Sequence, residues 1–253
     1  MIKISVVLAV FNEENNLESC LESVKDLAWE IVVCDGGSTD KTLKIAKKFG
    51  ARIINAQNQA NFHINKNKAI DNAKGDWILQ LDADEVVSAE LSREIKNVVN
   101  SNTDINGYWI PRRNLFLGRF LRKGGQYPDY TLRLYKNGKG KLPGEDVHEQ
   151  ATVEGKIEYL KNDLLHLRDK QFTTYLERFN RYTDLYSDQI KGAKVKIGVL
   201  SFIDFIILKP SFWFLKAYFR HKGYSDGFPG FVFAFFSSLR FPVSYIKYWS
   251  KNA

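Results

Sequence analysis

The sequence comprises 253 residues, of which 44% are hydrophobic, 14% aromatic and 26% charged, and its formal net charge is +8. These proportions exclude a disordered chain, a collagen and a coiled coil, and they supply enough apolar side chains for one sizeable core. The length suits one large domain, or one domain with an appendage.

The first hundred residues alternate between strand-like and helix-like segments. Short β-branched apolar runs predict strands over residues 4–10, 30–34, 52–55 and 77–81. Apolar residues at helical spacing and closing glycines predict helices over residues 13–27, 39–49 and 65–73. This alternation predicts an α/β fold with a parallel sheet that is covered by helices on both faces.

Beyond residue 107 the chain is rich in Gly, Arg and Tyr and contains shorter β-like runs. These runs cover residues 107–111, 131–135 and 156–160. A helix is predicted over residues 172–190, because Tyr175, Phe179, Tyr182 and Tyr186 would share one face. The remaining tail begins near residue 195.

Acidic residues stand where two of the predicted strands end. Asp35 closes the second strand and opens a glycine turn, and Asp82 and Asp84 close the fourth strand. Ligands bind beyond the carboxyl ends of the strands in an open parallel sheet. On an extended segment, two-residue spacing would point Asp82 and Asp84 the same way, as a divalent cation requires. A solvated turn is the alternative for that pair alone, but the two clusters together favour one crevice.

Four motifs stand in order in this half of the chain: SVVLAVFNEE (residues 5–14), DGGSTDKT (residues 35–42), GDW (residues 75–77) and LDADE (residues 81–85). Together they resemble family 2 glycosyltransferases, which are inverting enzymes of the Rossmann-like GT-A fold. The later PD, RL, VHE and GYSDG motifs (residues 128–129, 133–134, 147–149 and 223–227) are similar to bacterial lipopolysaccharide-core β-glucosyltransferases. The fold class implied is α/β, a mostly parallel GT-A sheet with flanking helices, followed by a C-terminal helical appendage that is aromatic and basic.

The resemblance implies a UDP-sugar donor and a Mg²⁺ or Mn²⁺ cofactor. The residues expected at the nucleotide-sugar are Val10, Asn12, Glu13, Asp35, Gly37, Asn67, Asp82 and Ala83. The metal would be held by Asp82 and Asp84, with His166 as a further ligand, although a core position is the alternative for His166. Such a metal neutralises the charge of the departing nucleoside diphosphate.

Transfer also needs a carboxylate base for the acceptor hydroxyl. Glu145, Asp146 and Glu149 compete for this role; the His–Glu pair at residues 148–149 favours Glu149, with Asp146 next. Five arginines fall within 22 positions of the acceptor half: Arg112, Arg113, Arg119, Arg122 and Arg133. The guanidinium group of arginine can bond phosphate or carboxylate groups with two N–H groups, so these residues would suit an anionic acceptor. The alternative is that they lie on a solvated loop.

Three parts of the chain are expected. Residues 1–100 would form the nucleotide-sugar-binding half, residues 101–194 the acceptor and catalytic half of the same domain, and residues 195–253 the C-terminal segment. From Val195 to Ser250 there are seven basic and two acidic residues, and 17 of the chain's 35 aromatic residues. The segment either packs on the catalytic domain or forms interfacial helices on an anionic membrane surface. Nucleic acid is not an expected partner, because no binding motif for it is found.

The expected protein is an inverting glycosyltransferase that moves a hexose, glucose above all, from a UDP-sugar to a lipid-linked glycan such as a lipopolysaccharide core. With two cysteines and no signal peptide, it is expected in the cytoplasm, peripheral on the inner face of the cell membrane. A nucleotidyltransferase is an alternative, but Phe11-Asn12-Glu13-Glu14 stands where its basic phosphate loop should be. A non-catalytic sugar-nucleotide or glycan-binding module is the other alternative; the acids Asp82, Asp84 and Glu149 argue against it.

Overall fold

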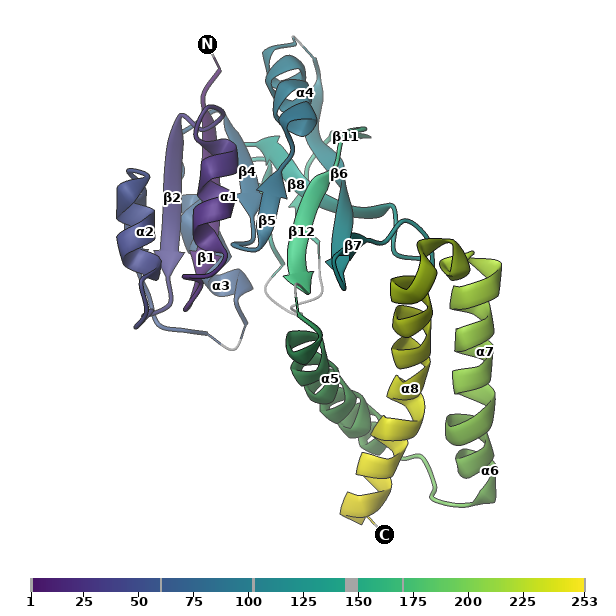
Figure 1. The fold of residues 1–253 in the computed structure, drawn as a ribbon. Coiled ribbons are helices and arrows are strands. Elements are labelled where there is room, and N and C mark those ends of the chain that lie inside the picture. Colours follow the sequence, from purple (N-terminus) through teal and green to yellow (C-terminus); the bar gives the residue numbers. More distant parts are fainter. Residues whose placement is uncertain (1, 60, 102, 144–149, 170, 253) are drawn as a thin grey trace. The chain divides into compact units, whose positions relative to one another are not determined.

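A computed structural model describes the whole chain except residues 1, 60, 102, 144–149, 170 and 253 (Figure 1). The chain forms two compact units. Unit 1 contains residues 1–112 and 129–166, and unit 2 contains residues 113–128 and 167–253. Each unit has its own hydrophobic clusters of buried side chains.

The first four strands of unit 1 form a parallel sheet in the order β3-β2-β1-β4. They are β1 (Ile4–Val10), β2 (Glu30–Asp35), β3 (Arg52–Asn55) and β4 (Trp77–Leu81). Burial on both faces explains why β1 and β2 read as continuous apolar runs. The four strands predicted in this region are confirmed.

The sheet then continues with antiparallel strands. β8 (Asp129–Lys136) pairs antiparallel with β4 and with β6 (Ile105–Phe116), and β12 (Leu164–Asp169) pairs antiparallel with β5 (Glu85–Val87). β11 (Lys156–Tyr159) pairs parallel with β6. The short strands are β7 (Arg119–Phe120), β9 (Gly140–Lys141) and β10 (Thr152–Val153).

Helices cover both faces of the unit 1 sheet. They are α1 (Leu17–Val24), α2 (Thr42–Lys48), α3 (His63–Asp71) and α4 (Ala89–Asn100). Side chains alternate along a strand, so Val6 packs with α1, α2 and α4, whereas Val7 packs with α3. The predicted α/β class is therefore confirmed.

Unit 2 is built around three long helical segments. They are α5 (Phe172–Gly192), a continuous stretch over residues 199–220, and α8 (Gly227–Asn252). The stretch contains α6 (Val199–Phe202) and α7 (Lys209–Leu215), with wider π-helical turns at Ile203–Leu208 and Lys216–Arg220. Pro210 has no N–H to bond the preceding turn, which accounts for the wider turns just before it.

A buried aspartate holds the turn before α8. Asp226 is 2% exposed, and its Oδ2 accepts hydrogen bonds from the backbone N–H groups of Arg122 and Lys123. A Cβ added to Gly230 would lie 2.0 Å from the carbonyl oxygen of Gly223. The start of α8 therefore packs backbone against backbone on the turn Gly223–Asp226.

The division into units differs from the boundaries expected at residues 101 and 195. Helix α5 belongs to unit 2, because its aromatic face packs on α8: the rings of Tyr175 and Phe179 lie 5.9 and 5.8 Å from the ring of Phe236. Over the residues that the structure describes, every helix is too short or too polar to cross a membrane.

Candidate active site

Two turns at the carboxyl ends of β1 and β2 are bonded to each other. Asn12 has a left-handed φ of 55°, which an asparagine tolerates, and its Oδ1 accepts a hydrogen bond from Thr39 N–H. Its own N–H donates to Ser38 Oγ, and Glu13 N–H donates to Thr42 Oγ1. The segments expected to hold the nucleotide thus form one preorganised unit.

Asp35 is 2% exposed and stabilises its own turn. Its carboxylate accepts hydrogen bonds from the N–H groups of Gly37 and Ser38 and from Ser38 Oγ. Gly37 has a φ of 92°, so the turn needs a glycine there. Val10 is buried, and its carbonyl oxygen accepts from Gly36 N–H. The predicted contacts of these residues with uracil and ribose remain predictions.

The segment Asp82-Ala83-Asp84 is a turn, not an extended continuation of β4. Glu85 N–H donates to the carbonyl oxygen of Asp82 at 3.0 Å, and Asp82 N–H donates to Glu85 Oε2. The expectation that strand spacing aligns the two carboxylates was therefore wrong, because a turn rotates successive side chains differently. Ala83 is 5% exposed and packs in the core.

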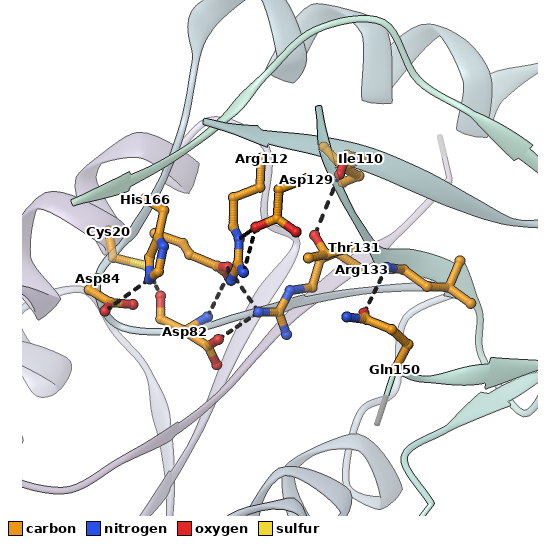
Figure 2. Close-up of polar contacts among 12 residues, drawn as sticks. Cys20, Asp82, Asp84, Ile110, Arg112, Asp129, Thr131, Arg133, Gln150 and His166 are labelled. Atoms are coloured by element: carbon orange, nitrogen blue, oxygen red, sulfur yellow. Dashed lines mark hydrogen bonds and ion pairs between the residues drawn. The ribbon is translucent and has the colours of Figure 1, made fainter. Parts of the chain in front are cut away.

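Two cations contact the carboxylate of Asp82, and Figure 2 shows one of them, Arg133. Oδ1 of Asp82 lies 2.5 Å from Lys66 Nζ of α3, and its Oδ2 lies 2.5 Å from Arg133 Nη2 of β8. The same Arg133 nitrogen lies 2.8 Å from Oε1 of Glu85, which is fully buried and also contacts Arg112. Arg112 in turn donates twice to Asp129 Oδ2. Three acids and three bases thus neutralise one another around the β4–β5 turn.

This arrangement shifts the pKa values of its members. Burial alone would raise the pKa of Asp82, but the charges of Arg133 and Lys66 outweigh burial and hold it well below the usual 3.8. Burial lowers the pKa of Lys66, opposed by Asp82. Burial and the nearby acids raise the pKa of Cys20, whose thiol donates to the Asp82 carbonyl oxygen. Asp82 is therefore ionised at neutral pH and the thiol is neutral.

His166 reaches the site through strand pairing. β12 runs antiparallel to β5 with His166 opposite Glu85, which brings His166 Nε2 to 3.3 Å from Asp84 Oδ2. A carboxylate oxygen and an imidazole nitrogen so close together fit a divalent cation. Among the described residues, no three His, Cys, Asp or Glu side chains converge on one point, since Asp82 faces Lys66 and Arg133. Two of the three predicted ligands are thus adjacent.

Helix α3 fixes the chain just before the expected base. Asn67 donates from Nδ2 to the Leu142 carbonyl oxygen and accepts at Oδ1 from Leu142 N–H. His63, which is 2% exposed, has Nδ1 3.0 Å from the Pro143 carbonyl oxygen. The base candidates Glu145, Asp146 and Glu149 lie outside the described residues.

The sequence did not reveal that Lys66 and Arg133 form ion pairs with Asp82, or that Glu85 forms one with Arg133. The only signal for these ion pairs was the position of Lys66 on a helix whose C-terminus leads directly into β4. The five arginines expected together are divided: Arg112 and Arg133 pair with acids of unit 1. Arg113, Arg119 and Arg122 belong to unit 2.

Comparison with known proteins agrees with this geometry. The model of glycosyl transferase family 2 matches residues 5–152. The chain is 26% identical over 260 residues to the lipopolysaccharide core biosynthesis glycosyltransferase LpsC of Rhizobium meliloti, covering 99% of this chain and 93% of that protein. It is 30% identical over 256 residues to the uncharacterized glycosyltransferase RT0209 of Rickettsia typhi, covering 95% of this chain and 86% of that protein.

Among solved structures, the chain is similar to the mannosyltransferase PcManGT of Pyrobaculum calidifontis, with a TM-score of 0.54 at 12% identity. The match covers 100% of this chain and 88% of that one. A parallel sheet with acidic turns at its carboxyl ends, continued by antiparallel strands, is a GT-A domain. The chain belongs to glycosyl transferase family 2, and it is a glycosyltransferase.

Proposed function

We propose that the protein transfers a hexose, glucose in the first place, with inversion from a UDP-sugar to a lipid-linked glycan such as a lipopolysaccharide core. The acceptor class is supported by the similarity to LpsC, whose name assigns it to lipopolysaccharide core biosynthesis. A nucleotide-sugar donor and a divalent metal are supported in general terms by the fold, which is similar to that of a mannosyltransferase in complex with GDP-Man and Mn²⁺.

One observation carries the proposal: Asp84 and His166 converge beside Asp82 at the same sheet edge as the bonded turns after β1 and β2. Asp84 and His166 would hold the metal, with Asp82 beside them. An imidazole ligand favours Mn²⁺ over Mg²⁺, which prefers oxygen ligands. When bound, the metal supplies a positive charge against the diphosphate of the donor.

The chain's own residues prepare this site for the donor. Lys66 and Arg133 keep Asp82 ionised and fixed, and the turn after β2 presents backbone to the nucleotide. We assign proton removal from the acceptor hydroxyl to Glu149, with Asp146 as the second choice. The two hydrogen bonds between Asn67 and the backbone of Leu142 fix the chain two residues before the segment 144–149.

We also propose that the protein acts at the inner surface of the cell membrane, where a lipid-linked acceptor resides. The basic excess and the aromatic content of residues 195–250 support this location.

The metal assignment is tested with Asp84→Asn, which keeps the shape of the side chain and removes its charge. Transfer from UDP-glucose should fall by about 10² or more, as when one charge-stabilising group is lost, and Mn²⁺-dependent UDP binding should weaken. Asp104→Asn, at an exposed position of the same unit, should leave both unchanged. Full activity of Asp84→Asn, or of the wild type in EDTA, would disprove the assignment.

The base assignment is tested with Glu149→Gln and Asp146→Asn. Loss of a general base costs about 10² to 10⁴ in rate, so Glu149→Gln should lose transfer by that order and keep its affinity for UDP-glucose. If Asp146→Asn is inactive while Glu149→Gln transfers normally, the two assignments must be exchanged.

A further inference from the structure

The helical stretch over residues 199–220 exposes a row of large apolar side chains, here called the apolar face. The exposed fractions of these residues range from 38% to 84%. The face consists of Val199, Leu200, Phe202, Ile203, Ile207, Leu208, Phe212, Leu215 and Phe219. Isolated exposed apolar residues are ordinary, but nine along one helical stretch form a continuous surface that needs an occupant.

The opposite side of the stretch is fixed to α8, as Figure 1 shows for α7. The ring of Phe205 stacks on Tyr245 at 5.3 Å, and Trp213 meets Phe241 at 6.1 Å. Phe214 packs on Phe231 at 6.0 Å. The aromatic residues of the tail therefore divide into an internal set, which holds the helices together, and an external set on the apolar face.

The dimensions of the stretch fit a helix that lies along a lipid surface. Its 22 residues would span at most about 33 Å, because 1.5 Å per residue is the rise of an α-helix and the π-helical turns at Ile203–Leu208 and Lys216–Arg220 are shorter. Only one side is free, so the helix would lie in the plane of the interface with its apolar side chains in the acyl region.

Charge distinguishes the two ends of the stretch from its middle. Lys194 and Lys196 precede the apolar face and Arg220 and Lys222 follow it, all of them exposed. In the middle, Lys209 is paired with Asp204 at 2.5 Å. When the apolar face is buried in lipid, exposed cations beside it attract anionic headgroups, and their long side chains can extend to the headgroup level.

Other basic residues of the tail act inside unit 2. The guanidinium of Arg240 lies 4.2 Å from the ring centre of Trp213, and burial lowers its pKa. Lys247 pairs with Asp184 at 3.0 Å and donates to Asn180. The basic residues of the tail are thus of two kinds: some are paired or buried inside unit 2, and those at the ends of the apolar face are exposed and available to an external anion.

We infer that the apolar face, flanked by Lys194, Lys196, Arg220 and Lys222, inserts into the surface of an anionic lipid bilayer. A second copy of the chain is a poorer occupant, because pairing two such faces in either direction brings cations against cations at both ends. Anionic headgroups neutralise both ends at once. The inference rests on the proposed function in one respect, that a lipid-linked acceptor places the enzyme at a membrane. It goes further by identifying the surface of the protein that contacts the lipid.

The test uses the full chain and vesicles of phosphatidylcholine, either alone or mixed with phosphatidylglycerol. The wild type should sediment with the mixed vesicles. The triple variant Leu200→Ser/Leu208→Ser/Phe212→Ser should lower the partition coefficient by about 100-fold or more, because three large apolar side chains lose their burial in lipid. The control Leu185→Ser/Ile246→Ser alters two exposed apolar residues on α5 and α8, outside the apolar face, and should bind as the wild type does.

The charges are tested separately with Lys194→Gln/Lys196→Gln/Arg220→Gln/Lys222→Gln. Each removed cation should weaken binding to the mixed vesicles by about fivefold, and added salt should reproduce part of the loss. The control Arg181→Gln removes an exposed cation of α5 and should change binding little. Equal binding of wild type and apolar triple variant would overturn the inference.

Two further readouts keep the test decisive. Hydrolysis of UDP-glucose without acceptor should be unchanged in every vesicle-binding variant, since the residues altered lie outside unit 1. If the wild type does not hydrolyse UDP-glucose, this counts against the proposed function but does not affect the conclusion from vesicle binding. If the wild type is a dimer and the apolar triple variant a monomer with unaltered vesicle binding, the face is an interface between copies and the inference is wrong.

Discussion

Each carboxylate oxygen of Asp82 contacts a cation, and this explains how Asp82, Asp84 and Glu85 can lie together at the end of β4. A buried carboxylate without a partner would shift its pKa upward and lose its charge. Lys66 and Arg133 prevent that and also orient the side chain. Together with Arg112, these two cations balance the charges of Asp82, Glu85 and Asp129. The site is therefore neither strongly anionic nor strongly cationic before a donor binds.

Asn67 offers a test at the residue scale, because it is expected beside the nucleotide and also donates to and accepts from the backbone of Leu142. Asn67→Ala leaves the backbone groups of the buried Leu142 without these partners, at a cost of about 1–3 kcal/mol in unfolding free energy. If its role is to position the 144–149 segment, kcat should fall by about tenfold with little change in the KM for UDP-glucose.

The control for this substitution is Asn72→Ala, at the exposed C-terminal end of the same helix. It should leave kcat and KM near the wild-type values. A rise in the KM for UDP-glucose with unchanged kcat in Asn67→Ala would instead support direct contact with the nucleotide.

At this scale the sequence predicts that Asp82, Asp84 and His166 lie near one another, but not how they are oriented or which cations pair with them. Asp82, Asp84 and His166 gather at one edge because strand order and β5–β12 pairing bring them there. The turn at Ala83, which separates the two carboxylates, depends on a hydrogen bond from Glu85 that no spacing rule contains. Lys66 was overlooked, because a helical lysine is ordinarily solvent-exposed.

Secondary-structure elements were best predicted where their residues are buried on both sides. The β-branched runs of β1 to β4 were placed correctly to within one residue. Helix α1 begins at Leu17 and not at residue 13, since Glu13 N–H bonds to Thr42 Oγ1 across the two turns. Such long-range hydrogen bonds are invisible to helical periodicity. The π-helical turns of the tail were likewise not expected.

The contact between α8 and the turn before it gives a prediction at the scale of elements. Gly230→Ala should destabilise unit 2 by about 2–3 kcal/mol, because its Cβ would meet the Gly223 carbonyl oxygen and backbone would have to move. The measurement is urea unfolding followed by the near-ultraviolet signal of the aromatic residues.

A matched glycine in the same unit serves as the control. Gly192 ends α5 with nothing within 4 Å of an added Cβ, so Gly192→Ala should be neutral or slightly stabilising. Equal stability of the two variants would show that the packing of α8 on Gly223–Asp226 contributes little to unit 2.

At the scale of the whole molecule, the site residues described all belong to unit 1, so nucleotide binding should stabilise the units unequally. UDP with Mn²⁺ at about 100 times its dissociation constant should add about 2.7 kcal/mol to the unit that binds it. Hydrogen exchange should then slow in β1, β2 and β4 and remain unchanged in α5 and α8. Uniform protection of both units would contradict a donor site confined to unit 1, and EDTA should abolish the metal-dependent part.

The chain passes between the two units three times, after residues 112, 128 and 166. As a result, the C-terminal helices cannot be removed by a single cut. Phe116, at the end of β6, and Leu121, in the segment between β6 and β8, are core residues of unit 2 together with Tyr175 and Val232. A chain truncated near residue 166 would leave these two side chains stripped of their neighbours, and Arg122 and Lys123 without Asp226. A minimal catalytic fragment of this enzyme would therefore require excision of residues 113–128 and a new hairpin, as well as truncation.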